Sequence, residues 1–348
     1  MTRSRHRLEG LDLARYLAFF GMVIVNFKIV MGADGGDGFL NVLTTALEGR
    51  AAATFVVLAG IGLGLAGIRG LDQTILVTVK RAVFLLVIGL ANMTIFDADI
   101  LHYYAFYFLF GVLLLPLGSR ALVAVLLGLN IAFVAMILTL NYDAGWNWDT
   151  YTYSRFWTPT GFVRNLFFNG WHPVIPWLGF LLFGIILSRM SLAERRTQVR
   201  LVLGGIGAFV LAEVLSGVLT AQMAGISPEL VDLVTTAPVP PMPLYTLAGL
   251  GAASVVVGVC LLVSDALRAV GVLGLVVPAG RQTLTLYIAH IVVGMGVLEA
   301  FGMLGGQTVG QAFGASLVFC LVATVYAYVW ALWFKRGPIE AAMRRIAG

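Results

Sequence analysis

Two ionisable residues that can act together lie at the start of an apolar run. Asp99 and His102 are three positions apart, so on a helix they lie on the same face and can touch. A carboxylate that accepts from one imidazole nitrogen leaves the other nitrogen free as a base, and it stabilises the imidazolium that forms. We therefore predict that His102 is a general base oriented by Asp99. The structural alternative is a histidine whose ring only satisfies a backbone carbonyl.

Asp97 lies two residues before Asp99 and is predicted to bind a polar substrate. Two aspartates and His102 could also ligate a metal ion, but no second histidine stands at ligand spacing. We therefore predict no metal site. The sequence also lacks the motifs of P-loops, zinc proteases and α/β-hydrolases, so none of these chemistries is indicated.

Arg15 and Asn26 combine a cation and an amide on one apolar run. Ten residues separate them, which on a helix puts both side chains within about 20° of the same face and roughly 16 Å apart along the axis. A guanidinium that faces a helix bundle can bind an anion, and an amide can stabilise an oxyanion. Alternatively, Arg15 extends to the lipid headgroups and pairs with Asp12, three residues before it.

Gly280 and Arg281 precede another predicted helix start. Free N–H groups at a helix start, with a guanidinium beside them, favour a phosphate or pyrophosphate. Thr283, Tyr287 and His290 follow at helical spacing and share one stripe. The alternative is a structural stripe next to an arginine that only contributes to membrane topology.

Two more polar clusters border apolar runs. Glu48 and Arg50 form either an interfacial ion pair or a substrate contact, and His172 lies before Trp177 where two prolines flank a helix start. His172 is therefore either part of the helix start or a substrate contact. We predict a substrate site from these four residues together with Asp97.

The elements that position these residues are membrane helices. Of 348 residues, 60% are hydrophobic and 11% charged, against roughly 25% charged in soluble domains. Two cysteines exclude a disulfide scaffold, and the high hydrophobicity excludes disorder. In lipid each backbone group needs a partner within its own segment, so the apolar runs must be helical. The predicted fold class is an all-α integral membrane protein, a single polytopic domain over residues 1–348.

Ten transmembrane helices are predicted from apolar runs near the length that spans a bilayer. Their approximate bounds are Leu11–Met31, Ala51–Ile68, Leu76–Ile95, Ile100–Pro116, Ala121–Leu140, Val174–Leu187, Leu201–Met223, Leu244–Val263, Gln282–Gly302 and Gln311–Phe334. The apolar segment Ala269–Val277 is too short to cross and is predicted as a re-entrant or interfacial piece.

The distribution of basic residues orients this bundle. With both termini cytoplasmic, 18 of the 22 lysines and arginines fall on the inner side, including those of the tail 335–348, as the positive-inside rule requires. The net charge of +5 is then explained by basic loops that face anionic membrane lipid, and it gives no indication of nucleic acid as a partner. We predict a multi-pass protein of a bacterial inner (plasma) membrane.

The one long polar connection, residues 141–171, is predicted on the outer side. It carries four tryptophans and two arginines, which are Trp146, Trp148, Trp157, Trp171, Arg155 and Arg164. These aromatic residues form either a belt at the headgroup level or a lid that stacks on a sugar or lipid-linked substrate.

Five stretches in order resemble one superfamily. They are Arg7–Asn26, Glu48–Gly60, Asp99–Ala105, His172–Gly179 and Gly280–His290, and they cover most of the chain from 7 to 290. The first is similar to the first helix of transmembrane acyltransferases, the superfamily of heparan-α-glucosaminide N-acetyltransferase and YeiB-like bacterial membrane proteins. The branch pattern is an arginine, ten residues and an asparagine, here Arg15 and Asn26.

The resemblance implies that an acyl group, most simply acetyl, moves from cytoplasmic acyl-CoA to a glycan or lipid-linked acceptor on the outer side. We expect acyl-CoA as the donor and assign it the residues Arg15, Arg281, Thr283, Tyr287 and His290. The heparan acetyltransferase has a histidine in the loop after its first helix, whereas the corresponding segment Met31–Thr45 has none. We therefore assign the general base to His102, with Asn26 as the oxyanion donor.

Two other classes of function stay open at this point. A transporter or flippase for a lipid or glycan would use the same intramembrane polar groups as a substrate path, and a membrane scaffold would need them for stability alone. Dependence on CoA separates the enzyme from both. The glycines of the seventh and eighth predicted spans allow close helix contacts, either within one chain or in a homodimer.

Overall fold

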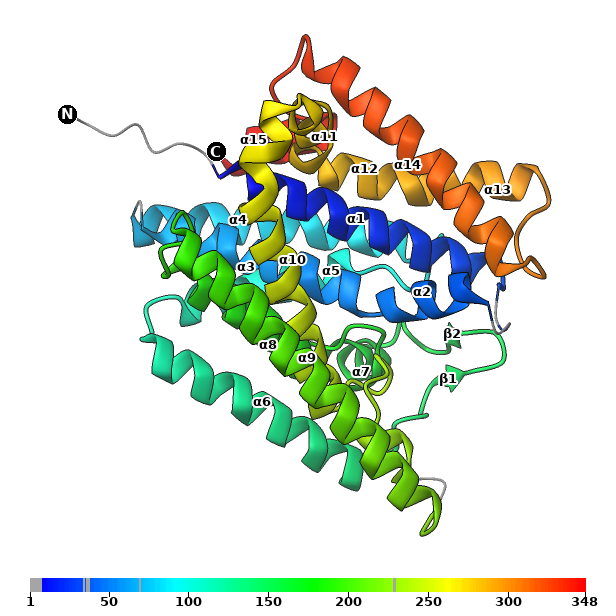
Figure 1. Cartoon of the computed structure of the whole chain (residues 1–348). Helices are drawn as coiled ribbons and strands as arrows, with labels where there is room; N and C mark the ends of the chain where they lie inside the picture. The colour runs from blue at the N-terminus through cyan, green and yellow to red at the C-terminus, as the bar shows by residue number, and fades with distance from the viewer. Residues whose placement is uncertain (1–7, 34, 36–37, 69, 228–229) are drawn as a thin grey trace. The chain divides into compact units, whose positions relative to one another are not determined.

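The structure is a computed structural model of the chain, and it describes residues 8–33, 35, 38–68, 70–227 and 230–348 (Figure 1). The basic residues of segment 1–7, Arg69, and the first part of the stretch Arg7–Asn26 lie outside the described residues. So does part of the loop after the first helix.

Nearly all regular structure in the described residues is helical. The helices are α1 (Glu9–Val30), α2 (Phe39–Leu47), α3 (Arg50–Gly67), α4 (Leu71–Asn92), α5 (Leu101–Leu114), α6 (Ser119–Thr139), α7 (Pro159–Arg164), α8 (Val174–Ser188), α9 (Arg195–Ala224), α10 (Pro243–Ala269), α11 (Val272–Arg281), α12 (Thr283–Ala289), α13 (Gly296–Ala300), α14 (Val309–Ala331) and α15 (Pro338–Ala347). Two short π-helical segments, η1 (Asn165–Asn169) and η4 (His290–Met295), continue α7 and α12, and η3 (Asp232–Val234) is a 3₁₀ turn. The strands β1 (Trp146–Asn147) and β2 (Thr152–Tyr153) form one antiparallel hairpin.

Local sequence signals explain several of these helix starts. Proline occupies the first position of α7, α10 and α15, where its missing N–H costs nothing and its fixed φ suits the helix. Thr158 caps α7 by accepting from the Gly161 N–H. Thr308 and Gln311 form a capping box at the start of α14.

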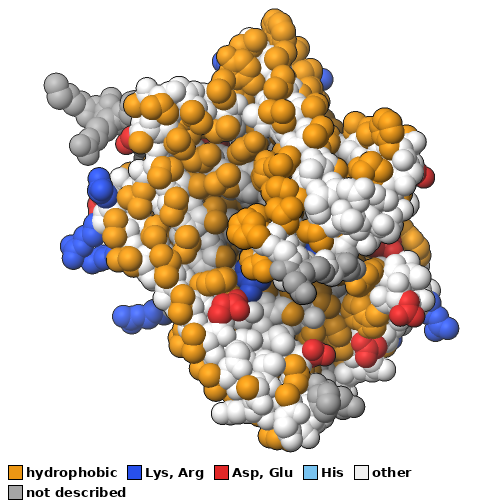
Figure 2. Space-filling model, turned by 45° about the vertical axis from the view of Figure 1, so that its right-hand side comes forward, with side chains coloured by type: hydrophobic (Ala, Val, Ile, Leu, Met, Phe, Trp, Pro, Cys, Tyr) orange, Lys and Arg blue, Asp and Glu red, His pale blue; other side chains and the backbone are white. Residues whose placement is uncertain are grey.

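Eight helices among the described residues are long and apolar enough to cross a membrane, and the bent pair of α7–η1 and α8 makes a ninth if it counts as one span. The fourth predicted span is helix α5, which has only 14 residues. In α6 and α9, 22% of the most apolar window is buried inside the protein, and hydrophobic side chains cover much of the face seen in Figure 2. Because so much exposed hydrocarbon is unfavourable in water, these helices face lipid. The prediction of an all-α membrane protein is confirmed.

Three segments contain more regular secondary structure than the sequence pattern predicts. The segment 141–171 folds into the β1–β2 hairpin and the helices α7 and η1, and the tail ends in α15. The short apolar piece predicted at Ala269–Val277 corresponds to α11, which begins after Gly271 in a left-handed conformation with φ of 79°. Glycine adopts this conformation without steric penalty.

The described chain divides into two compact units. Unit 1 consists of Met1–Phe55, Met190–Ile206 and Ala252–Ala341, and unit 2 of Val56–Arg189, Gly207–Gly251 and Ala342–Gly348. The single polytopic domain over residues 1–348 stays a prediction, and each unit is described by itself.

In unit 1, helix α1 is the central element and packs against α2, α11, α12 and α14 (Figure 1). Close approach depends on glycine. A Cβ atom added to Gly10 would lie 2.8 Å from the carbonyl oxygen of Cys260, and one added to Gly280 would collide with the backbone of Asp12. Both contacts hold the polar end of α1 against α10 and α11.

In unit 2, the main packed pairs are α4 with α5 and α6 with α8, and α8 also packs on α5. Gly89 of α4 lies so close to the backbone of His102 that no side chain fits between them. Gly60 and Gly184 face each other where α3 crosses α8, and a Cβ on either would collide with a carbonyl of the other helix. Small residues at such crossings are typical of membrane helix pairs.

We predict that Gly184→Ala destabilises the protein by roughly 1–3 kcal/mol, because the new methyl group overpacks the α3–α8 crossing. Gly217→Ala in α9 is the matched control, because nothing lies within 4 Å of its added Cβ. Thermal unfolding of the detergent-purified variants should show a lower midpoint for Gly184→Ala and an unchanged or higher midpoint for Gly217→Ala. Equal midpoints would contradict the close crossing.

Candidate functional site

His102 and Asp99 meet inside unit 2, as their spacing predicts. The Nδ1 atom of His102 lies 3.7 Å from Oδ2 of Asp99, and both side chains are fully buried. Asp99 is fixed by two further donors, the backbone N–H of Leu101 at 2.8 Å and the amide of Asn92 at 3.2 Å. The carboxylate is therefore held in place beside the ring by groups that do not depend on the histidine.

The imidazole of His102 is packed by aromatic rings. Tyr103 lies with its ring centroid 3.8 Å away, and Phe156 contacts the ring edge-to-face at 5.7 Å. Neither ring nitrogen has a hydrogen-bond partner among the described residues. A buried polar atom without a partner is unfavourable, so this ring has hydrogen-bonding capacity that the protein itself does not use.

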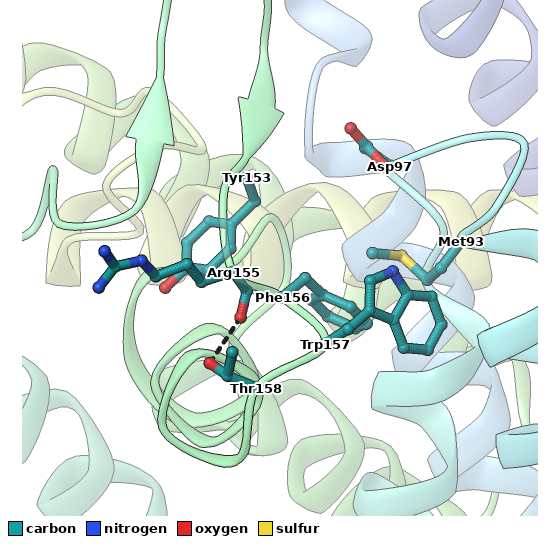
Figure 3. Close-up of a pocket in the computed structure, with 7 residues that line it drawn as sticks. All are labelled: Met93, Asp97, Tyr153, Arg155, Phe156, Trp157 and Thr158. Atoms are coloured by element: carbon teal, nitrogen blue, oxygen red, sulfur yellow. Dashed lines mark hydrogen bonds between the residues drawn. The ribbon is translucent and has the colours of Figure 1, made fainter.

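Phe156, which contacts the ring of His102, also lines an open pocket of about 210 Å³. Figure 3 shows its lining, with Met93, Phe156 and Trp157 on the apolar side. Asp97 also lines it, and burial raises the pKa of this carboxyl above its usual range. The pocket therefore combines hydrocarbon and aromatic surface with one carboxylate, a short way along the chain from the Asp99–His102 pair.

His172 lies just before α8, and Trp177 lies in the first turn of that helix. The hydroxyl of Tyr107 donates to the carbonyl of His172 at 2.5 Å, and the rings of His172 and Trp177 pack edge-to-face at 4.7 Å. Trp177 is fully buried. On the described residues, Nδ1 of His172 and Nε1 of Trp177 have no hydrogen-bond partner. The aromatic contacts support the structural interpretation of this helix start.

Asn26 forms a buried pair with His290 in unit 1. Its amide nitrogen lies 2.9 Å from Nε2 of His290, and Nδ1 of the same ring contacts the carbonyl of Tyr287. Since the amide nitrogen can only donate, Nε2 accepts and the imidazole is neutral. The oxyanion donor and a residue predicted for the acyl-CoA site are thus in direct contact.

Arg15 and Arg281 share the carboxylate of Asp12. Arg15 lies 2.6 Å from Oδ1 of Asp12, and the Nε of Arg281 lies 3.4 Å from Oδ2. Glu9 binds Arg281 at 3.2 Å and Arg268 at 3.1 Å. Asp12 is 1% exposed, so the arginines compensate a buried charge. A bound phosphate has to compete with these carboxylates.

The predicted anion site at the start of α12 already holds a carboxylate of the chain. Glu340 of α15 accepts from the backbone N–H of Leu284 at 2.8 Å and of Thr285 at 3.1 Å, and from the Thr285 hydroxyl at 2.5 Å. Thr283 itself is buried. The residue types predicted a phosphate or pyrophosphate here, which stays a prediction. The spacing along the chain gave no sign that Glu340, 55 residues away from Thr285, binds these N–H groups.

Glu48 pairs with Lys28, whose ammonium lies 2.7 Å from its carboxylate. Lys28 also donates to the Thr45 hydroxyl at 3.3 Å, and only 8% of its side chain is exposed. Arg50 begins α3, and its carbonyl accepts from Thr54. The spacing of Glu48 and Arg50 predicts either an ion pair or a substrate contact, and both stay predictions. It gives no indication of Lys28, although a lysine inside an apolar run is an available signal.

No group of three or more histidine, cysteine, aspartate or glutamate side chains that could hold a metal ion occurs in the described part of the chain. Glu213 is the acidic residue of helix α9, and its carboxylate accepts from the Thr236 hydroxyl at 3.0 Å.

We predict that Glu340→Gln lowers the stability of the protein by about 1–2 kcal/mol, because it weakens three charge-assisted hydrogen bonds at the start of α12. Glu299→Gln, at an exposed glutamate of α13, is the matched control. Thermal unfolding should separate the two variants. The cap would have no role if both kept the wild-type midpoint.

Comparison with known proteins identifies the family of this chain. Residues 7–212 match the profile described as heparan-alpha-glucosaminide N-acetyltransferase, catalytic, and residues 186–348 match a family described as a protein of unknown function (DUF418). Searches of curated proteins and of solved structures find no match. Since the first profile covers more than half of the chain and includes α1, Asp99, His102 and His172, the chain belongs to the heparan-alpha-glucosaminide N-acetyltransferase catalytic family of membrane proteins.

Proposed function

We propose that this multi-pass protein is an acetyltransferase of a bacterial inner membrane that takes an acyl group from cytoplasmic acyl-CoA and transfers it to a sugar hydroxyl or amine on the outer side. The observation that carries the proposal is the buried Asp99–His102 pair, which lies inside the segment that matches the acetyltransferase profile. Its unused ring nitrogens fit a base that waits for a substrate proton.

In the proposed reaction His102 removes the proton of the acceptor O–H or N–H as the acceptor atom attacks the thioester carbonyl. A bond forms between that atom and the carbonyl carbon, and the carbonyl electrons become an oxyanion. When the oxyanion collapses, the C–S bond breaks and the thiolate leaves with the proton from the imidazolium. The products are the acylated acceptor and free CoA, and His102 returns to its neutral form.

Asp99 is the positioning residue of this step. Its Oδ2 lies 3.7 Å from Nδ1 of His102, just beyond hydrogen-bond distance. In the proposed step the two atoms approach, so that Nδ1–H donates to the carboxylate and Nε2 is the nitrogen that acts as base. The carboxylate also offsets the positive charge that develops on the ring. The two donors from Leu101 and Asn92 keep Asp99 from rotating away.

Asn26 is proposed as the donor to the oxyanion. Its amide contacts His290 in the structure, so this role requires the substrate oxygen to replace the imidazole as the acceptor of that N–H. Tyr287 and His290 would then line the path of the pantetheine arm.

Arg15 and Arg281 are proposed to bind the phosphates of acyl-CoA, with Thr283 beside them. Among the ion pairs of the described residues at this end of unit 1, Arg15, Arg268 and Arg281 face Glu9, Asp12 and Asp265. Both arginines proposed for the phosphates are therefore already paired with carboxylates. Binding of a phosphate exchanges a carboxylate partner for a phosphate partner, and does not fill an unpaired cationic site.

The acceptor is proposed to bind in unit 2, beside His102. Asp97 lines the pocket next to Phe156 and can accept from a hydroxyl or an amine. His172 and Trp177, also in unit 2, keep the predicted role of substrate contacts as part of this proposal. Glu48 and Arg50 belong to unit 1, and their predicted substrate contact is a separate part of the proposal.

We predict that His102→Ala lowers acetyl transfer by at least about a hundredfold, the usual contribution of a general base. The assay supplies labelled acetyl-CoA to membranes that contain the protein and follows label in sugars and lipids. Asp99→Asn should give a smaller loss. Asn130→Ala, at another buried polar residue of unit 2, is the control and should transfer at the wild-type rate.

The assay also separates the proposal from its alternatives. Undiminished transfer by His102→Ala, with a wild-type unfolding midpoint, would remove His102 from the chemistry. Absence of any CoA binding by the wild-type protein would remove the acetyltransferase itself and favour transport of a lipid or glycan.

A further inference from the structure

The segment 141–171 contains one tryptophan that differs from the other three. Trp146 stacks on Trp148 at 4.5 Å and meets Trp171 edge-to-face at 5.2 Å. Their indole groups are tied to the fold, since Trp146 donates to the carbonyl of Asn169 and Trp148 to Asp143. Trp157 is 65% exposed and lines the pocket beside Phe156. It is the indole face of this group best placed to meet a ligand.

Arg155 links this pocket to a second one. It lines the pocket of Figure 3, where its guanidinium points away from Met93 and Trp157. Arg155 also lines a second pocket of about 240 Å³ together with Thr158 and Arg164. The two pockets therefore share Arg155 and Thr158 and lie side by side.

The second pocket is cationic. Its lining residues include two arginines, Arg155 and Arg164, and no aspartate or glutamate. Two like charges that face one pocket repel each other unless an anion lies between them. Burial raises the pKa of the neighbouring Tyr153 phenol, and the charge of Arg164 opposes this rise. Arg164 thus lies close to a residue of the first pocket.

The backbone at Arg155 is held in an unusual conformation. Its φ is 61°, in the left-handed region that residues other than glycine rarely adopt. The carbonyl of Arg155 accepts from both the N–H and the hydroxyl of Thr158, and a Cβ on Gly161 would collide with it. Such strain persists only where surrounding contacts fix it, and it is common at ligand sites.

We propose that the two pockets form one binding site for a sugar that carries an anionic group, a carboxylate or a phosphate ester. The sugar ring lies against Trp157 with a hydroxyl or amine toward Asp97, and the anionic group lies between Arg155 and Arg164. The identification of this sugar as the acetyl acceptor rests on the proposed function. Binding of an anionic sugar at this site does not depend on acetyl transfer.

The site can be tested by binding without CoA. The purified full chain is titrated with glucosamine 6-phosphate, glucuronate and uncharged glucose, and binding is followed by calorimetry and by quenching of tryptophan fluorescence. We expect the two anionic sugars to bind at least about tenfold more tightly than glucose, since one charge-assisted hydrogen bond is worth roughly that factor. Added salt should weaken this preference because the arginines are exposed.

Variants locate the site. Arg155→Gln with Arg164→Gln should remove the preference for anionic sugars, whereas Arg196→Gln, at an exposed arginine of α9, should retain it. His102→Ala should bind the anionic sugars like the wild type. Absence of acetyl transfer by the wild-type protein, together with intact binding of the anionic sugars, would count against the proposed function and leave this site standing.

A lipid-borne sugar anion is tested with phosphatidylcholine nanodiscs with and without phosphatidylinositol. Binding only to the discs with phosphatidylinositol, and only with both arginines present, would support the same site with a lipid-linked ligand. Equal binding of charged and uncharged sugars would overturn the proposal. So would wild-type binding by the double variant, or no binding to any of these probes.

Discussion

The constraint on which this structure depends is the free-energy cost of an ionisable group inside a membrane protein. Such a group must be paired, hydrogen-bonded or neutral. Asp12 is compensated by Arg15 and Arg281, and Lys28 by Glu48. Asp99 accepts from Asn92 and from a backbone N–H. The polar groups of these buried helices are therefore satisfied mostly by partners from the chain itself.

His102 is one exception to this pattern. It is fully buried, lies beside a fixed carboxylate, and has two ring nitrogens without hydrogen-bond partners among the described residues. Phe156 contacts its ring and also lines the pocket with Asp97. A fully buried base is shielded from water, which favours transfer of an acyl group to a bound acceptor over hydrolysis.

The sequence predicts contacts that are local on a helix and misses those that join distant segments. The Asp99–His102 and Asp12–Arg15 pairs follow from a spacing of three residues. The contacts of Glu340 with α12, of Lys28 with Glu48, and of Asn26 with His290 join residues 20 or more positions apart, so helix packing alone determines them. Composition predicts the membrane class because apolar residues dominate the chain. It does not determine the number of spans, because a short apolar helix such as α5, with 14 residues, is below the usual length of a membrane span.

Chemical rescue tests whether His102 acts as the base. His102→Ala removes the ring that packs against Tyr103 and Phe156, and free imidazole is the probe for the space that it leaves. Added imidazole should restore acetyl transfer to this variant in a concentration-dependent manner and leave the wild-type rate unchanged. A variant that binds acetyl-CoA and acceptor normally, yet gains no transfer from imidazole at any concentration, would contradict it.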